Sequence, residues 1–216
     1  MSQSSQPPDL PKDTAAIVPP IPVPTHGPGG VFAVACSTTI QAPARTCLEK
    51  VLDMESYSLW NTFVTKASVA SPGSLNSEDE DVASLINPQN VAPGAKLKFD
   101  AVMSVGSSPY KVDPEVTFLE TFTPSSSSST TTDGGRKGKG YRVCWKSTGM
   151  PHFLLHTERV QEFVEVAGAE TEYSCWETFG GWLAHLVPKG QVADGFERWM
   201  TSLKKVVEEE ARAGSS

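Results

Sequence analysis

The pattern that most constrains the fold lies near the end of the chain, where apolar residues recur every three or four positions over residues 191–212. The apolar face of this segment consists of Val192, Phe196, Trp199, Leu203 and Val206. The opposite face carries charged residues such as Arg198 and Glu209, so the spacing predicts one long amphipathic helix. A helix with a single apolar stripe must bury that stripe against another element, which the rest of the chain has to supply.

Most of the preceding chain shows the two-residue alternation of half-buried β-strands. Such strands are predicted over residues 31–40, 63–70, 97–105, 116–122, 141–145, 154–166 and 172–179. Two short helices are predicted after the first strand, over residues 44–53 and 57–60. Sequential strands favour an antiparallel sheet with one apolar face. We therefore predict an α+β fold in which a curved antiparallel sheet wraps the long C-terminal helix, with a cavity between them.

Three segments interrupt this pattern. Residues 1–30 contain eight prolines and lack both the basic start and the apolar run of a secretory signal, so a disordered leader is predicted. The stretch 71–93, which holds the acidic run 78–81, and the Ser/Thr-rich stretch 125–135 are predicted to be solvated loops. The folded domain is therefore expected to span residues 31–213.

Charge and cysteine content narrow the functional classes. The 25 acidic residues outnumber the 18 basic ones, giving a formal charge of −7, so neither nucleic-acid binding nor general binding to anionic membranes is expected. No apolar run approaches the length needed to cross a bilayer, so no membrane span is predicted. The four cysteines are widely spaced without a CxxC pair, which favours free thiols and a cytoplasmic protein.

The sequence offers no recognised pattern for a cofactor. His152, His156 and His185 do not have the spacing of metal ligands. The glycines between residues 134 and 140 do not open a helix, as a nucleotide-binding loop would. We therefore expect no metal and no cofactor.

Four short segments carry a more specific pattern. They are residues 40–43 (IQAP), residues 51–61 (VLDMESYSLWN), residues 141–145 (YRVCW) and residues 177–183 (ETFGGWL). Their content and order resemble the SRPBCC or START-like superfamily of helix-grip proteins, and within it the polyketide cyclase/dehydrase-like branch. The resemblance covers residues 31–212 and implies the helix-grip fold, in which the sheet encloses the C-terminal helix.

The resemblance also implies a function. It implies that a polyketide-like or lipid-like hydrophobic molecule binds between the sheet and the C-terminal helix. Because the superfamily contains both binders and enzymes, cofactor-independent cyclisation or dehydration by general acid–base chemistry is one implied activity. Two alternatives stay open: a non-catalytic carrier, and a protein-interaction module resembling the helix-grip activators of chaperone ATPases. Such a module would use an external surface, such as residues 182–186 or the proline-rich leader.

Glu177 is the first candidate catalytic residue. It shares strand parity with Phe179, so it points into the interior if Phe179 does. A buried carboxylate can exchange protons near neutral pH. The competing explanations are an ion pair with Arg142 or Arg159, or a position at a bulge that faces solvent.

His156 is the second candidate catalytic residue. It lies two positions from Glu158, so the two side chains share one face of a strand. There they either relay a proton or hold a polar ligand group, or they belong to a face turned to solvent.

The candidate ligand-binding residues are mostly aromatic. They are Trp60, Asn61, Phe99, Tyr141, Trp145, Glu158, Tyr173 and Phe179. Aromatic walls suit a planar apolar ligand, and core packing is the alternative role for each ring. Asn61 either donates to a ligand carbonyl or caps the second short helix.

Overall fold

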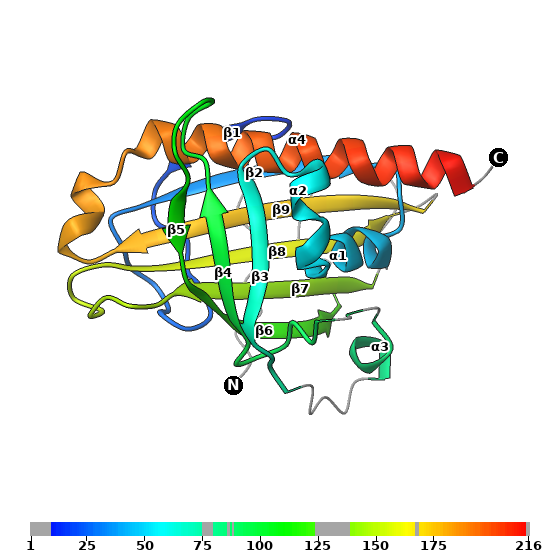
Figure 1. Cartoon of the computed structure of the whole chain (residues 1–216), viewed down its shortest axis with the longest axis horizontal. Coiled ribbons are helices and arrows are strands. Elements are labelled where there is room, and N and C mark those ends of the chain that lie inside the picture. The colour runs from blue at the N-terminus through cyan, green and yellow to red at the C-terminus, as the bar shows by residue number, and fades with distance from the viewer. Residues whose placement is uncertain are drawn as a thin grey trace, which may run out of the picture.

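The structure, a computed structural model, describes residues 10–74, 80–85, 87, 89–123, 139–166 and 169–214. One antiparallel sheet of nine strands dominates this part of the chain (Figure 1). The strands are β1 (Ala15–Val18), β2 (Phe32–Ile40), β3 (Val64–Ser71), β4 (Lys96–Ala101), β5 (Tyr110–Val112), β6 (Pro114–Phe122), β7 (Gly140–Ser147), β8 (His156–Val166) and β9 (Glu170–Gly180). Their spatial order is β1-β2-β9-β8-β7-β6-β4-β3, with β5 paired to β4.

The helical elements are α1 (Ala44–Leu52), the 3-10 turn η1 (Met54–Ser56), α2 (Tyr57–Trp60), α3 (Glu80–Ala83), the 3-10 turn η2 (Trp182–Leu186) and α4 (Lys189–Gly214). The three predicted helices form α1, α2 and α4, and the structure adds the short helix α3 and two 3-10 turns that the sequence did not predict. Figure 1 shows α4 running along the sheet, with α1 and α2 on the same side. The curved sheet around a long C-terminal helix is the predicted α+β helix-grip arrangement.

The main core lies between α4 and the concave face of the sheet. The predicted stripe of α4 faces this core, and Phe196, Trp199 and Leu203 are almost completely buried. From the sheet, alternate side chains of each long strand meet this stripe, including Val34 of β2 and Phe163 of β8. The alternation in the sequence therefore separates the two faces of most strands correctly. In β6 a bulge between Val116 and Phe118 turns Leu119, and not Phe118, toward the main core.

A second, smaller core covers the convex face, and it corrects the prediction of a disordered leader over residues 10–30. β1 pairs with β2, and Ile21 and Val23 are buried against Val160 and Trp176. The centre of this convex face is itself apolar, so burying it under the N-terminal segment removes apolar surface from water and stabilises the fold. Residues 1–9 lie outside the described residues. We call residues 19–30 the strap.

Hydrogen bonds fix the strap without a continuous strand pairing. Thr178 donates from its hydroxyl to the carbonyl of Ile21 at 2.6 Å, and Trp176 donates from its indole to the carbonyl of Pro22 at 3.4 Å. Proline has no backbone donor, so a proline-rich segment can cross a sheet face without leaving N–H groups unpaired.

The predicted acidic loop is partly ordered. It contains α3, and Val82 and Leu85 are buried rather than solvated. Residues 75–79, 86 and 88 of this loop lie outside the described residues, as does the whole Ser/Thr-rich stretch 125–135.

Candidate ligand-binding site

A small, partly open cavity of about 60 Å³ lies on the concave side of the sheet, near the ends of β7 and β9 and the start of β8, and is lined by Phe63 and by residues of β3 to β9. Its walls include Phe63, Phe99 and Trp145, and its polar side includes Arg159 and Glu177. The volume is that of roughly two water molecules, whereas pockets for small-molecule ligands usually exceed about 300 Å³. The predicted cavity is therefore present but small, and a larger ligand requires it to open.

Arg159 and Glu177 form a partly buried ion pair at this cavity, with side chains 7% and 15% exposed. They face each other across β8 and β9, and Arg159 Nε donates to Glu177 Oε2 at 3.0 Å. Burial, the largest single influence, lowers the pKa of Arg159, but the charge and hydrogen bond of Glu177 together with the nearby Cys175 and Tyr173 raise it by more, so the pKa is raised overall. The guanidinium also lies over the rings of Phe196 and Trp199, at 4.1 and 5.2 Å from their centroids. Glu177 therefore points inward as predicted, and of its two proposed partners it pairs with Arg159.

Several buried donors in the interior have no acceptor among the described residues. They are Asn61 Nδ2, Gln161 Nε2 and Trp199 Nε1. Gln161 lies two residues from Arg159 on the same face of β8, and its other amide atom, Oε1, accepts from the Tyr173 hydroxyl at 2.7 Å. In the described part of the chain, the Nε bond to Glu177 is also the one hydrogen bond of the Arg159 guanidinium. The interior thus presents more donors than acceptors.

Aromatic rings occupy most of the interior. This interior aromatic cluster consists of Tyr57, Trp60, Phe99, Trp145 and Trp199. Trp199 lies at its centre, with ring centroids 5.5 to 6.2 Å from those of Tyr57, Trp60 and Trp145. Edge-to-face packing at these distances stabilises a core and also provides flat apolar walls. Of these rings, Phe99 and Trp145 border the cavity directly.

The other predicted ligand-binding residues on the concave face do not border the cavity. Tyr141, Tyr173 and Phe179 are buried in the main core, and Phe179 stacks on Phe32 with 4.7 Å between ring centroids. Asn61 has the capping role, because its Oδ1 accepts from the backbone N–H groups of Phe63 and Val64 after α2; its Nδ2 has no partner among the described residues, and its role as a donor to a ligand stays a prediction.

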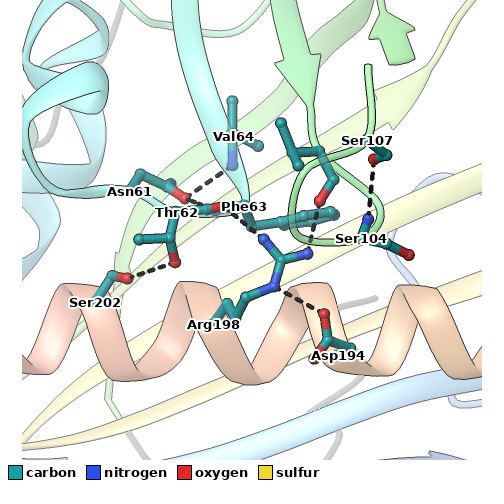
Figure 2. Close-up of polar contacts among 10 residues, drawn as sticks. Asn61, Thr62, Phe63, Val64, Ser104, Ser107, Asp194, Arg198 and Ser202 are labelled. Atoms are coloured by element: carbon teal, nitrogen blue, oxygen red, sulfur yellow. Dashed lines mark hydrogen bonds and ion pairs between the residues drawn. The ribbon is translucent and has the colours of Figure 1, made fainter. Parts of the chain in front are cut away.

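An arginine of α4 holds the segments around the cavity mouth together (Figure 2). Arg198 donates to the carbonyl of Thr62 at 2.5 Å and to the carbonyl of Val102 at 2.6 Å, and its Nε donates to Asp194 at 2.8 Å. Thr62 immediately precedes Phe63, and Val102 begins the β4–β5 hairpin. We call this set of contacts the Arg198 clamp. Because it joins α4 to both segments, opening of the mouth requires it to loosen.

Two predicted site residues, His156 and Glu158, lie on the convex face and not in the cavity. Glu158 is fully buried under the strap, where its carboxylate accepts from Thr25 N and Thr25 Oγ1 at 2.7 Å and from Thr117 Oγ1 at 2.8 Å. His156 and Glu158 do share a face, as their spacing requires, but the strap makes that face neither solvated nor part of the interior. His156 and Glu177 are on opposite sides of the sheet and cannot act on one substrate.

The convex face has a cavity of its own, of about 210 Å³, under the glycine-rich end of the strap. Its walls include His26, His152 and His156, whose ring centroids lie 3.7 to 4.9 Å apart. His152 and His156 stack in parallel, so their ring nitrogens do not converge on a common point. Over the residues that are described, no three His, Cys, Asp or Glu side chains are arranged to hold a metal ion.

Of the residues that line the cavity, sequence reasoning named Phe99, Trp145 and Glu177 as candidates and missed the others, among them Arg159. Arg159 was considered only as a partner of Glu177, and Phe63 and Thr157 were not considered. The signal for Arg159 and Thr157 was present, because both share strand parity with the buried Phe163. All four cysteines are free and buried, in agreement with the prediction of free thiols.

Comparison with known proteins adds evidence on the fold. No protein-family model matches the sequence, and no curated protein is significantly similar to it. Solved structures do match. A START superfamily protein from Mycobacterium smegmatis aligns over 82% of this chain and 97% of its own, with a TM-score of 0.52 and 15% identity. The chain has the START-like helix-grip fold.

Two further solved structures, a synthase and a protein of a biosynthetic pathway, align with this chain at similar scores. A point mutant of norcoclaurine synthase from Thalictrum, in complex with a transition-state analogue, covers 85% of this chain and 99% of its own, at a TM-score of 0.51 and 8% identity. The di-domain ARO/CYC protein StfQ of the steffimycin biosynthetic pathway covers 82% of this chain and 45% of its own, at a TM-score of 0.50 and 10% identity. None of the described helices is long and apolar enough to cross a bilayer.

Proposed function

We propose that the protein binds a small apolar molecule, polyketide-like or lipid-like, that carries hydrogen-bond-accepting oxygens, in the interior between the sheet and α4. Phe99 and Trp145 contact its apolar body, and Arg159 binds a carbonyl, phenolate or carboxylate oxygen. The proposal needs no metal or cofactor.

The surplus of buried donors carries this proposal. Buried polar groups in proteins almost always have a partner, and each buried donor without one costs about 1–3 kcal/mol. Asn61, Gln161 and Trp199 together offer three such donors. A core built only for stability would be expected to use apolar side chains at these positions. An oxygen-bearing ligand, with or without bridging water, supplies the acceptors that the protein lacks.

The small cavity requires that binding be accompanied by opening. Phe63 lies between the cavity and α4, and the segments that flank the mouth are held by the Arg198 clamp. Moving the β4–β5 hairpin away from α4 would enlarge the mouth without breaking the long strands. Two of the similar structures are a synthase and a protein of a biosynthetic pathway, which supports a ligand in the interior of this fold as the first hypothesis to test.

Glu177 is placed to move a proton once a ligand is bound. Its Oε2 accepts from Arg159, and its Oε1 has no hydrogen bond within the described residues. A ligand carbonyl held by Arg159 would have its adjacent C–H bonds near this second oxygen. The carboxylate could then remove a proton from carbon while Arg159 stabilises the resulting enolate, which is the first step of an aldol cyclisation or a dehydration. Without this step the protein would be a carrier.

The small cavity is also the observation that favours the interaction-module alternative. A core that is simply full would bind nothing, and its function would then lie on the surface. The fluorescence titration described next distinguishes a ligand-binding interior from a filled core.

The experiment is a fluorescence titration with 1-anilinonaphthalene-8-sulfonate, a planar apolar probe with acceptor oxygens. We expect saturable binding at one site per chain. The double variant Arg159→Gln/Glu177→Gln removes both charges together, so that neither is left unpaired, and we expect it to weaken binding at least about tenfold.

The matched control is the double variant Arg142→Gln/Glu162→Gln. Arg142 and Glu162 form an equally close pair, at 2.7 Å, but on the convex face of β7 and β8. This control should bind the probe like the natural protein. Equal binding by all three proteins, or no binding by any, would contradict the proposal.

A further inference from the structure

One end of the molecule exposes a cluster of large apolar side chains. Met150, Phe153, Trp182 and Leu186 are 51%, 72%, 80% and 78% exposed. They come from the β7–β8 loop and from η2, and we call them the apolar tip. They make up four of the nine large apolar side chains that are exposed in the described part of the chain. Scattered single exposures are ordinary, but a cluster at one end marks an interaction surface.

The two segments that carry the apolar tip are held rigidly together. Trp182 N donates to the carbonyl of Phe153 at 3.0 Å, and Leu183 N donates to the carbonyl of Leu154 at 2.8 Å. Gly181 permits this approach, because it has a φ of 89° and any Cβ there would lie 2.6 Å from the Leu154 carbonyl oxygen. The exposed side chains are therefore presented by fixed backbone.

The two segments that carry the apolar tip contain no acidic residue, although the chain as a whole is acidic and Asp113 lies beside Thr148 at the base of the loop. Residues 148–157 and 178–193 contain no Asp or Glu, and their ionisable groups are Lys189 and three histidines. The fourth histidine of the chain, His26, packs against two of these three. The formal charge of −7 therefore resides elsewhere, and this end complements phosphate groups.

We propose that the apolar tip inserts into the interfacial region of a phospholipid bilayer. A projecting group of Trp, Phe, Leu and Met side chains matches the depth at which amphipathic aromatic rings bind membranes. Lys189 and the histidines contact the headgroup phosphates, and no carboxylate of these two segments has to be desolvated. A surface that binds another protein usually has a polar rim with charges of both signs around its apolar centre, and these two segments do not provide such a rim.

Insertion at this end would also bring the interior cavity to the bilayer. Ser147 and Thr157, which line that cavity, flank the loop that carries Met150 and Phe153. The cavity's position next to the bilayer matters only if the cavity binds a ligand, so this point rests on the proposed function. The insertion itself does not depend on it, because the tip residues are not part of the cavity lining.

The experiment is co-sedimentation of the natural protein with phosphatidylcholine vesicles, with and without a minor fraction of phosphatidylserine. We expect binding to both, stronger with phosphatidylserine. The variant Trp182→Ser/Leu186→Ser should lower the partition coefficient at least about tenfold. The control Leu59→Ser/Val105→Ser removes two side chains that are 85% and 88% exposed outside the tip, and it should bind like the natural protein. All four positions are exposed, so the variants should fold.

A second measurement locates the contact. Vesicles with brominated acyl chains should quench Trp182, and the quenching should be lost in Trp182→Phe. Three results would overturn the proposal: no sedimentation of the natural protein, equal sedimentation of the tip variant, or self-association through the tip without vesicle binding. None of these bears on the interior probe titration, so this proposal and the proposed function can fail separately.

Discussion

Glu158 illustrates what strand parity, the alternation of side chains between the two faces of a strand, can and cannot predict for a single residue. Parity correctly placed it on one face with His156, but the face itself was decided by the strap, which comes from the other end of the chain. Likewise, parity placed Glu177 inside, whereas its pairing with Arg159 depends on the register between β8 and β9. Register follows from turns and packing over long distances in sequence, so a local pattern does not determine it.

Replacing Glu158 tests its role under the strap. Glu158→Ala leaves the Thr25 amide and two threonine hydroxyls without their acceptor, so we expect the free energy of unfolding to fall by about 2–3 kcal/mol. Glu158→Gln should recover most of this loss, because its amide oxygen can accept from Thr25 N while its NH₂ group donates to the hydroxyl oxygens. Urea unfolding measures both, and an alanine variant as stable as the natural protein would rule out this role.

Gly195 offers a second test at residue scale, at the cavity mouth. A Cβ at Gly195 would lie 2.4 Å from the Phe63 ring. Although alanine favours a helix by about 1 kcal/mol over glycine, overpacking costs about 1–3 kcal/mol, so Gly195→Ala should be neutral to destabilising and should displace Phe63. Gly190→Ala is the control in the same helix, because no atom lies within 4 Å of its added Cβ, and it should be neutral or stabilising. Thermal unfolding of both variants checks the contrast.

Among the elements, the strap is the largest that the sequence prediction got wrong, beside the short α3 in the predicted acidic loop. Proline content alone predicted disorder, but Ile21 and Val23 had an apolar partner in the outer face of β2, β8 and β9. That face was detectable in principle, because Ala33, Val160 and Trp176 all point outward by parity. The two short helices, the long strands and α4 were predicted well, because their periodicity is local and strong.

The strap should make the stability of the protein depend on pH. Burial lowers the pKa of His26; Glu158 partly offsets this, while His156, His152 and Lys146 add to it. Below about pH 6.5 the unfolded chain therefore binds this proton more readily than the folded chain, so the free energy of unfolding should decrease as the pH falls from there. Urea unfolding at about pH 7.5 and about pH 5 measures the difference, which His26→Gln should reduce. An unchanged difference in that variant would assign the effect to other groups.

The Arg198 clamp makes a prediction about the β4–β5 hairpin. Arg198→Lys can replace at most part of the two carbonyl contacts, so backbone amides near Thr62 and Val102 should exchange hydrogen faster. Hydrogen-exchange mass spectrometry measures this, with the exposed Lys205→Gln in the same helix as the control. If the clamp limits opening, the lysine variant should also bind the anilinonaphthalene probe faster, whereas unchanged exchange would show that other contacts hold the hairpin.

At the scale of the whole molecule, the START-like helix-grip fold places a donor-rich, aromatic interior on one side of a sheet and a strap on the other. The five tryptophans report on these regions separately. Trp60, Trp145 and Trp199 belong to the interior aromatic cluster, Trp176 donates to the strap, and Trp182 is in the apolar tip.

The most direct test of interior binding is therefore the ¹H–¹⁵N spectrum of the five indole N–H groups during a titration with 2-naphthoate, assigned by single Trp→Phe variants. We predict that the Trp199 and Trp145 resonances shift together and saturate, with the Trp199 proton moving as its N–H gains an acceptor, while the Trp182 and Trp176 resonances stay in place. Shifts confined to Trp182 or Trp176, or no shift in the interior at saturating naphthoate, would contradict ligand binding between the sheet and α4.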